Sequence, residues 1–166
     1  MKSIKEYSIT PLVLFLFLFL DGQLSNLFNN FFSIEWHATS HFLLIFMIFV
    51  SISLSKQYNL LLFFLLGLCY DVYYFHIIGI AVVLLPLLSL LVCSINTVML
   101  MNRWTRLLSV VTLVFLFEII SFTLAHFLNL TTLPFSDFIV YDLVPTLVLN
   151  SLVLLIFQPL FEKFYL

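Results

Sequence analysis

The placement of charged residues constrains this chain most, because they leave apolar stretches about as long as a bilayer is thick. A helix needs about 20 mostly apolar residues to cross the ~30 Å hydrocarbon layer. Of 166 residues, 64% are hydrophobic and 8% are charged, whereas a soluble domain has roughly 25% charged residues. A soluble fold would leave large apolar patches in water, so lipid is the expected surrounding. The six expected spanning helices cover residues 11–29, 38–55, 59–75, 77–100, 107–128 and 139–158.

The basic residues predict how these helices are oriented. Lys and Arg collect in the cytoplasmic loops of membrane proteins. If the N-terminus is inside, six crossings place every Lys and Arg on the cytoplasmic side and none in the outer loops. The sequence therefore predicts an all-α integral membrane protein, a six transmembrane helix bundle in one polytopic domain over residues 1–166, with the N-terminus and C-terminus cytoplasmic. The basic residues are Lys2, Lys5, Lys56, Arg103, Arg106 and Lys163.

The sequence disfavours several classes of function. Six basic residues and a net charge of −2 cannot form a phosphate-binding surface, so we expect no nucleic-acid partner. There is no HExxH motif, no GxSxG motif and no glycine-rich phosphate loop, so we expect no enzyme and no cofactor. His37 and His41 have the i, i+4 spacing that joint metal ligation on a helix needs, and His76 could join them at the outer face. Histidines near a membrane surface are more often plain polar residues, and we expect no metal site.

Four carboxylates lie within the expected spanning helices: Asp21, Asp71, Glu118 and Asp142. An ionised Asp at the centre of a membrane helix costs about 2.5 to 3.5 kcal/mol on the insertion scale. These acids must therefore be neutral, paired or close to water, and acids inside a membrane mark functional sites by default.

Helical spacing predicts that the acids share faces with small and polar residues. Residues three or four apart lie on one side of a helix, and such faces let helices approach and hydrogen-bond. Either these faces hold the bundle together, or they receive a partner's helix. We expect the Gly67/Asp71 face and the Asp142/Thr146/Asn150 face to form a polar centre. The candidate residues for partner binding or for the polar core of the bundle are Asp21, Gly67, Asp71, Glu118, Asp142, Pro145, Thr146 and Asn150.

Two of the acids follow a tyrosine, at Tyr70-Asp71 and Tyr141-Asp142. A Tyr-Asp pair on each of two helices resembles the arrangement in intramembrane aspartyl proteases. In those enzymes two carboxylates share a proton and activate water. Those enzymes carry a GxGD pattern at one Asp, whereas Asp71 follows the residues GLCY. Protease chemistry is therefore not expected.

Three segments of the chain are distinctive: LDGQ at residues 20–23, GLCYDVYYF at 67–75 with Gly79 and the Leu-Pro pair at 85–86, and VPTLVLN at 144–150 followed by PLF at 159–161. Together they resemble the MreD family of bacterial rod-shape-determining proteins. The resemblance covers most of the chain, and the second and third segments are the most specific.

The resemblance implies a multi-pass protein of the bacterial cell membrane that helps to position peptidoglycan synthesis during elongation or peripheral growth. It implies the single-span protein MreC as partner, within a wider complex that holds MreB, RodA and a penicillin-binding protein. It carries over no catalytic residue. A small-solute transporter, or the substrate-binding subunit of an energy-coupling vitamin transporter, stays open as the alternative. MreD-like proteins are sometimes grouped by fold with such subunits. A Pro-broken helix and intramembrane acids also suit a solute pocket.

Overall fold

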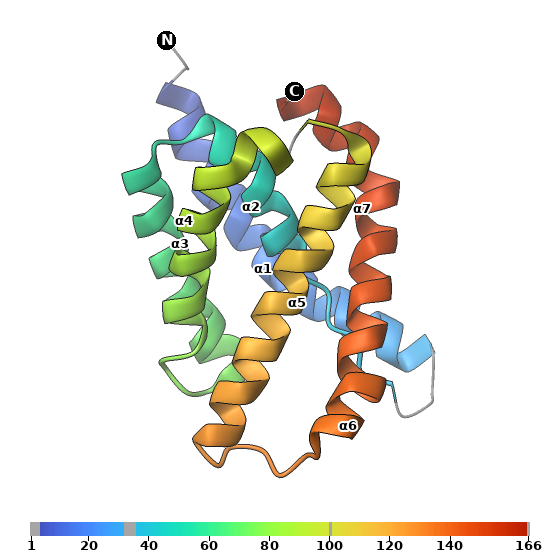
Figure 1. Ribbon diagram of the computed structural model, residues 1–166. Coiled ribbons are helices and arrows are strands. Elements are labelled where there is room, and N and C mark those ends of the chain that lie inside the picture. The colour runs from blue at the N-terminus through green and yellow to red at the C-terminus, as the bar shows by residue number, and fades with distance from the viewer. Residues whose placement is uncertain (1–3, 32–35, 100, 166) are drawn as a thin grey trace.

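The structure, a computed structural model, describes residues 4–31, 36–99 and 101–165 as a bundle of helices with no strand in these ranges (Figure 1). The first described turn of the chain and the last lie at the same end of the bundle. In chain order the elements are α1 (Ile4–Phe31), α2 (Phe42–Ser53), α3 (Lys56–Tyr70), η1 (Asp71–Phe75), α4 (Ala81–Met99), α5 (Arg103–Phe127), α6 (Phe135–Asp137), η2 (Phe138–Leu143) and α7 (Val144–Tyr165).

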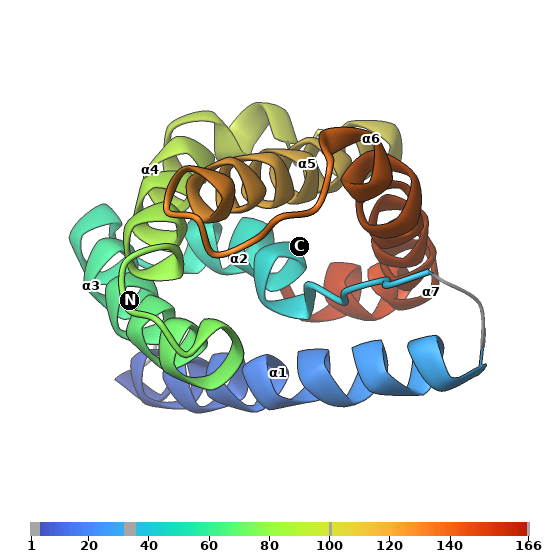
Figure 2. The same ribbon diagram turned by 90° about the horizontal axis from the view of Figure 1, so that it is seen from below.

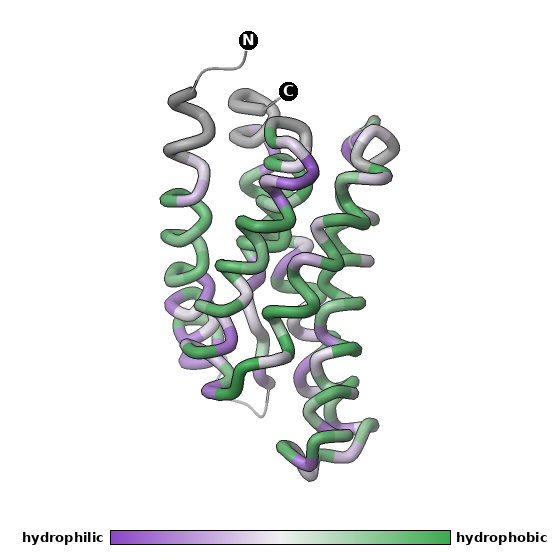
Figure 3. The backbone as a smooth tube through the Cα atoms, turned by 90° about the vertical axis from the view of Figure 1, so that its left-hand side faces the viewer, coloured by the Kyte–Doolittle hydropathy of each residue, from purple (hydrophilic) through white to green (hydrophobic). Residues whose placement is uncertain are grey.

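Four helical segments are long and apolar enough to cross a membrane: Thr10–Phe31, Lys56–Phe75, Arg103–Phe127 and Phe135–Pro159. Two more apolar helices, over Phe42–Ser51 and Ala81–Ile95, are shorter. Hydrophobic residues run along the helices, and many of the hydrophilic ones gather near the ends and turns (Figure 3). The predicted fold class is confirmed: the chain is an all-α membrane protein whose described part contains six main helices.

The short helix α2 forms the centre of the bundle. Its sequence FLLIFMIFV is apolar on every side, which is typical of a helix surrounded by others. Every residue from 42 to 50 is buried, and α1, α4, α5 and α7 enclose the helix (Figure 2). Its 12 residues give a length of about 18 Å.

The helix expected over residues 38–55 therefore begins later than its apolar composition indicates. Residues 36–41 are not helical, and α2 starts only at Phe42. The physical reason is that side chains of α1 and α7 accept hydrogen bonds from the backbone N–H groups of these residues and hold them extended.

The third and fourth main helices pack closely because Gly67 has no side chain. A Cβ atom on Gly67 would lie 2.6 Å from the carbonyl oxygen of Ala81 and 2.7 Å from Cα of Val82. Both obstacles are backbone atoms, which cannot move without shifting α4. Gly67 is thus the contact point of the α3/α4 pair.

We expect Gly67→Ala to destabilise the protein, because overpacking against backbone costs about 1 to 3 kcal/mol. Gly22→Ala is the matched control: its new Cβ would meet the hydroxyl of Tyr74 at 2.8 Å, which is the far end of a side chain that can move. The measurement is the free energy of unfolding in mixed micelles. A Gly67→Ala protein as stable as Gly22→Ala would contradict the close-contact role.

Candidate functional site: a polar core around a buried extended segment

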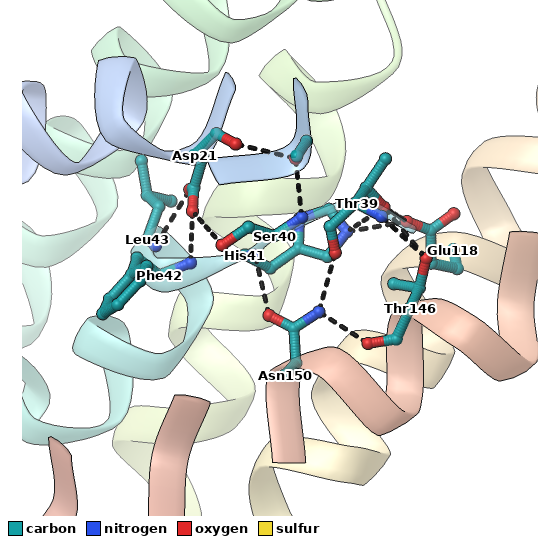
Figure 4. A network of polar contacts seen from close by, with 10 residues as sticks. Asp21, Thr39, Ser40, His41, Phe42, Leu43, Glu118, Thr146 and Asn150 are labelled. Carbon is teal, nitrogen blue, oxygen red and sulfur yellow. Dashed lines mark hydrogen bonds and ion pairs between the residues drawn. The ribbon is translucent and has the colours of Figure 1, made fainter. Parts of the chain in front are cut away.

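Residues 36–41 form an extended segment that enters the bundle and is largely buried from Ala38 onward. Ala38, Ser40 and His41 are each at most 2% exposed. Backbone N–H and C=O groups away from water must find partners inside the protein. Because an extended chain cannot bond to itself as a helix does, the partners come from neighbouring helices (Figure 4).

One edge of the extended segment bonds to a row of side chains on α1. The acceptors lie four residues apart on the helix, and the donors lie two apart on the segment. Four helical residues rise about 6 Å and two extended residues about 6.6 Å, so the two rows stay in register. The backbone N–H donors and their acceptors are Ala38 to Asn29 Oδ1 (2.9 Å), Ser40 to Ser25 Oγ (2.8 Å) and Phe42 to Asp21 Oδ1 (2.6 Å).

The other edge bonds to η2 and α7 through the intervening residues. Asn150 contributes most, because its amide also donates to the carbonyl oxygen of Thr39 at 2.8 Å and so pairs with the segment as a neighbouring strand would. The N–H donors and their acceptors are His37 to the Tyr141 carbonyl oxygen (2.8 Å), Thr39 to Thr146 Oγ1 (3.0 Å) and His41 to Asn150 Oδ1 (2.7 Å).

Asp21 closes this arrangement by capping the N-terminus of α2. Its carboxylate accepts hydrogen bonds from the N–H groups of Phe42 (2.6 Å) and Leu43 (3.2 Å) and from the hydroxyl of Ser40 (3.1 Å). The first N–H groups of a helix lack partners within it, and the helix dipole favours negative charge there. Asp21 therefore allows α2 to begin inside the bundle.

Asp71 does the same for α4. Its carboxylate accepts from the N–H groups of Gly79 (2.8 Å), Ala81 (2.7 Å) and Val82 (3.0 Å), and the residue is 0% exposed. Gly79 has a φ of +146°, a conformation that residues with a side chain rarely adopt. The turn between α3 and α4 is thus held by the Asp71 carboxylate, which accepts from its N–H groups, and by a glycine within it.

Glu118 on α5 holds the side chains of the extended segment. Its Oε1 atom accepts from the hydroxyl of Thr39 at 2.8 Å and lies 2.6 Å from Nε2 of His41. Thr39 also contacts Thr146 through their hydroxyl oxygens, 3.2 Å apart. The segment is therefore fastened to α5 as well as to α1 and α7.

The structure brings some of the candidate residues together and separates others. Asp21, Glu118, Thr146 and Asn150 converge on the extended segment (Figure 4). Pro145 is buried beside Thr146 at the start of α7. Gly67 and Asp71 belong to the separate α3/α4 junction.

Asp142 differs from the other acids. It lies in the π-helical turn η2, is partly exposed, and accepts no hydrogen bond within the part of the chain that the structure describes. It lines a cavity that Glu118 and His37 also line.

The sequence patterns predicted residues 38–41 as part of a helix and singled out only His41 among their side chains. The segment ATSH and the α1 row of Asp21, Ser25 and Asn29 at spacings of four were the available signals. His37 and His41 are not one helical turn apart, because four extended residues span about 13 Å. His37 and His41 therefore lack the helical spacing that joint metal ligation would need.

We expect Asp21→Ala and Asp71→Ala each to lower the free energy of unfolding by at least about 3 kcal/mol, because each removes a buried carboxylate that accepts three hydrogen bonds. Asp21→Asn and Asp71→Asn should lose less, since one acceptor oxygen remains. Asp142→Ala is the control and should cost below about 1 kcal/mol. The measurement is unfolding in mixed micelles, and equal losses at all three positions would refute the capping roles.

Comparison with known proteins identifies the family of the chain. A family model described as rod shape-determining protein MreD matches residues 6–166. A Streptococcus pneumoniae protein named cell shape-determining protein MreD is 44% identical over 166 residues, covering the whole of both chains. No solved structure matches the chain. This multi-pass membrane protein therefore belongs to the MreD family of cell shape-determining proteins.

Proposed function

We propose that the chain is a non-enzymatic scaffold of the bacterial cell-shape machinery that receives the transmembrane helix of MreC and helps to position peptidoglycan synthesis. The observation that carries the proposal is an open apolar groove between α1 and α3. The wider complex would hold MreB, RodA and a penicillin-binding protein.

The polar groups of the core support a structural rather than a catalytic role. Asp21 and Asp71 each accept hydrogen bonds from three groups at the start of the next helix. Glu118 is bonded to the extended segment. Carboxylates committed to backbone and side-chain donors hold the bundle together and are poorly placed to act as general acids or bases. We propose that all the candidate residues except Asp142 serve the core, Glu118 through its Oε1 atom.

The groove offers room for one more helix. It consists of two adjoining hollows of about 330 and 500 Å³ that share Phe15 and Cys69. On the α3 side it runs from Leu62 to His76, a distance of about 21 Å. Its lining is apolar except at the end marked by His76. A single apolar helix matches this length and chemistry better than a polar solute does.

The exposed face of α1 points to the same occupant. Thr10, Leu14, Leu18 and Asp21 are the buried residues of its described side chains and form a narrow stripe. Large apolar side chains cover the remaining surface, among them Leu12, Phe15, Leu16 and Phe19. Association of membrane helices is driven in part by van der Waals packing, to which these side chains would contribute.

We expect Cys69→Trp to reduce co-purification of MreC in mild detergent about tenfold or more, because an indole would fill the point where the two hollows meet. Val72→Trp at the outer part of the groove should act in the same direction. Leu152→Trp on the exposed face of α7 is the matched control and should leave the yield of MreC unchanged. All three proteins are first checked for a single symmetric peak in size-exclusion chromatography.

Full recovery of MreC with Cys69→Trp and Val72→Trp would contradict the groove as its binding site. Mass spectrometry of the purified complex separates the alternative function, since a transporter subunit would bring down ATPases or a bound vitamin in place of MreC.

We also propose that both termini are cytoplasmic. All Lys and Arg residues fall on one side if the chain crosses six times, and the first and last described turns share one end of the bundle. A fluorescent protein fused after Arg103 should fold and fluoresce. Activity of alkaline phosphatase fused at the same position would instead place that loop outside.

A further inference from the structure

A cavity of about 230 Å³ lies between α5, η2, the end of α3 and the extended segment. It borders the second half of α5, so it lies in the half of the bundle away from the two termini (Figure 1). It is separate from the α1/α3 groove and from the proposed site of MreC. Its polar lining is formed by His37, Thr39, Glu118, Ser121 and Asp142.

Two carboxylates in this cavity have unused acceptor capacity. In the described ranges, both contacts to Glu118 end on Oε1, and Asp142 accepts no hydrogen bond. The two acids interact electrostatically, although they come from different helices. His41 already contacts Glu118 through Oε1, and His37 interacts electrostatically with Asp142. A further positive group would meet the other oxygen of Glu118 and the carboxylate of Asp142.

Ser121 is the second, independent indication of a ligand. It is 7% exposed, and its hydroxyl has no partner in the part of the chain described. On the same helix Ser109, Thr112 and Thr123 each donate to the carbonyl oxygen four residues earlier, as hydroxyls in helices commonly do. Ser121 does not make this bond, although it is the buried one and lies one turn from Glu118.

Aromatic rings form the rest of the lining. Phe122 and Phe138 stack with centroids 4.0 Å apart, and Phe117 meets Tyr70 edge to face at 5.6 Å. All four line the cavity. The face of an aromatic ring attracts a cation, more strongly where water is excluded.

We propose that this cavity binds a protonated primary amine, held by the carboxylates of Glu118 and Asp142 and the hydroxyl of Ser121 and enclosed by the aromatic rings. An ammonium group has three donors and no acceptor, which matches these three acceptors. An anion would meet two carboxylates. A metal ion fits poorly, because the described residues contain no cluster of three metal-binding side chains.

The amine could belong to the ethanolamine head group of a phospholipid or to a small soluble amine, and two probes separate these sources. The full-length protein is placed in nanodiscs made from phosphatidylglycerol, which has no amine. Binding of ethanolamine is measured by calorimetry, with ethylene glycol as the neutral control. Retention of phosphatidylethanolamine is measured by native mass spectrometry after addition of that lipid.

We expect saturable binding of at least one of the two amine probes and none of ethylene glycol. Asp142→Asn should weaken amine binding about tenfold or more, since a charge-assisted hydrogen bond is lost, and Ser121→Ala should weaken it severalfold. Asp137→Asn, a neighbouring acid outside the cavity lining, is the matched control and should bind as the unmodified protein does. Cys69→Trp in the α1/α3 groove should also leave amine binding unchanged, so failure of the MreC site does not affect this result.

Binding of only the lipid would identify a head-group site, and binding of only ethanolamine a site for soluble amines. The proposal is overturned if neither probe binds saturably, if ethylene glycol binds equally well, or if Asp142→Asn binds like Asp137→Asn. Should Asp142→Asn fail to give a single peak in size-exclusion chromatography, Ser121→Ala, which removes one oxygen atom, decides in its place.

Discussion

The bundle depends on satisfying the backbone of one extended segment inside the protein. Each unpaired N–H or C=O away from water costs several kcal/mol in a membrane, and residues 37–43 present an unbroken run of N–H groups. Side chains of α1 and α7 and one carbonyl of η2 accept from all of them. This requirement brings α1 and α7, the first and last helices, to opposite edges of one segment. It also explains why the polar residues of those helices recur every fourth position.

The same need to pair backbone N–H groups determines where α2 and α4 begin. A carboxylate on the preceding helix caps α2 in one hairpin and α4 in the other, through Asp21 and Asp71. Because both carboxylates are buried, the first N–H groups of α2 and α4 are paired inside the protein. This accounts for the shortness of α2, whose 12 residues are fewer than the about 20 that cross a membrane. Gly67 then lets the second hairpin close tightly.

The connection between α5 and α7 has no such capping carboxylate. Glu118 on α5 bonds to the extended segment and not to the start of α7, and the chain enters α7 through the π-helical turn η2. A π turn is wider than an α turn and often marks a functional position. Here it supplies the carbonyl of Tyr141 to the extended segment and leaves Asp142 at the cavity. Asp142 and Ser121 thus lie together at one cavity.

The sequence by itself determined the lipid surroundings, the helical class and the faces that carry the acids, since apolar length and a spacing of four are local properties of the chain. The family could also be recognised from residues 67–75 and 144–150. Tertiary structure alone decided that residues 38–41 are extended, that Asp21 and Asp71 cap different helices, and that His37 and His41 lie apart. Apolar composition cannot separate a helix from a buried strand-like segment, because both exclude water equally. Periodicity tells which side a residue faces, whereas the partner it meets there, such as Asn150 for His41, is set by packing between distant parts of the chain.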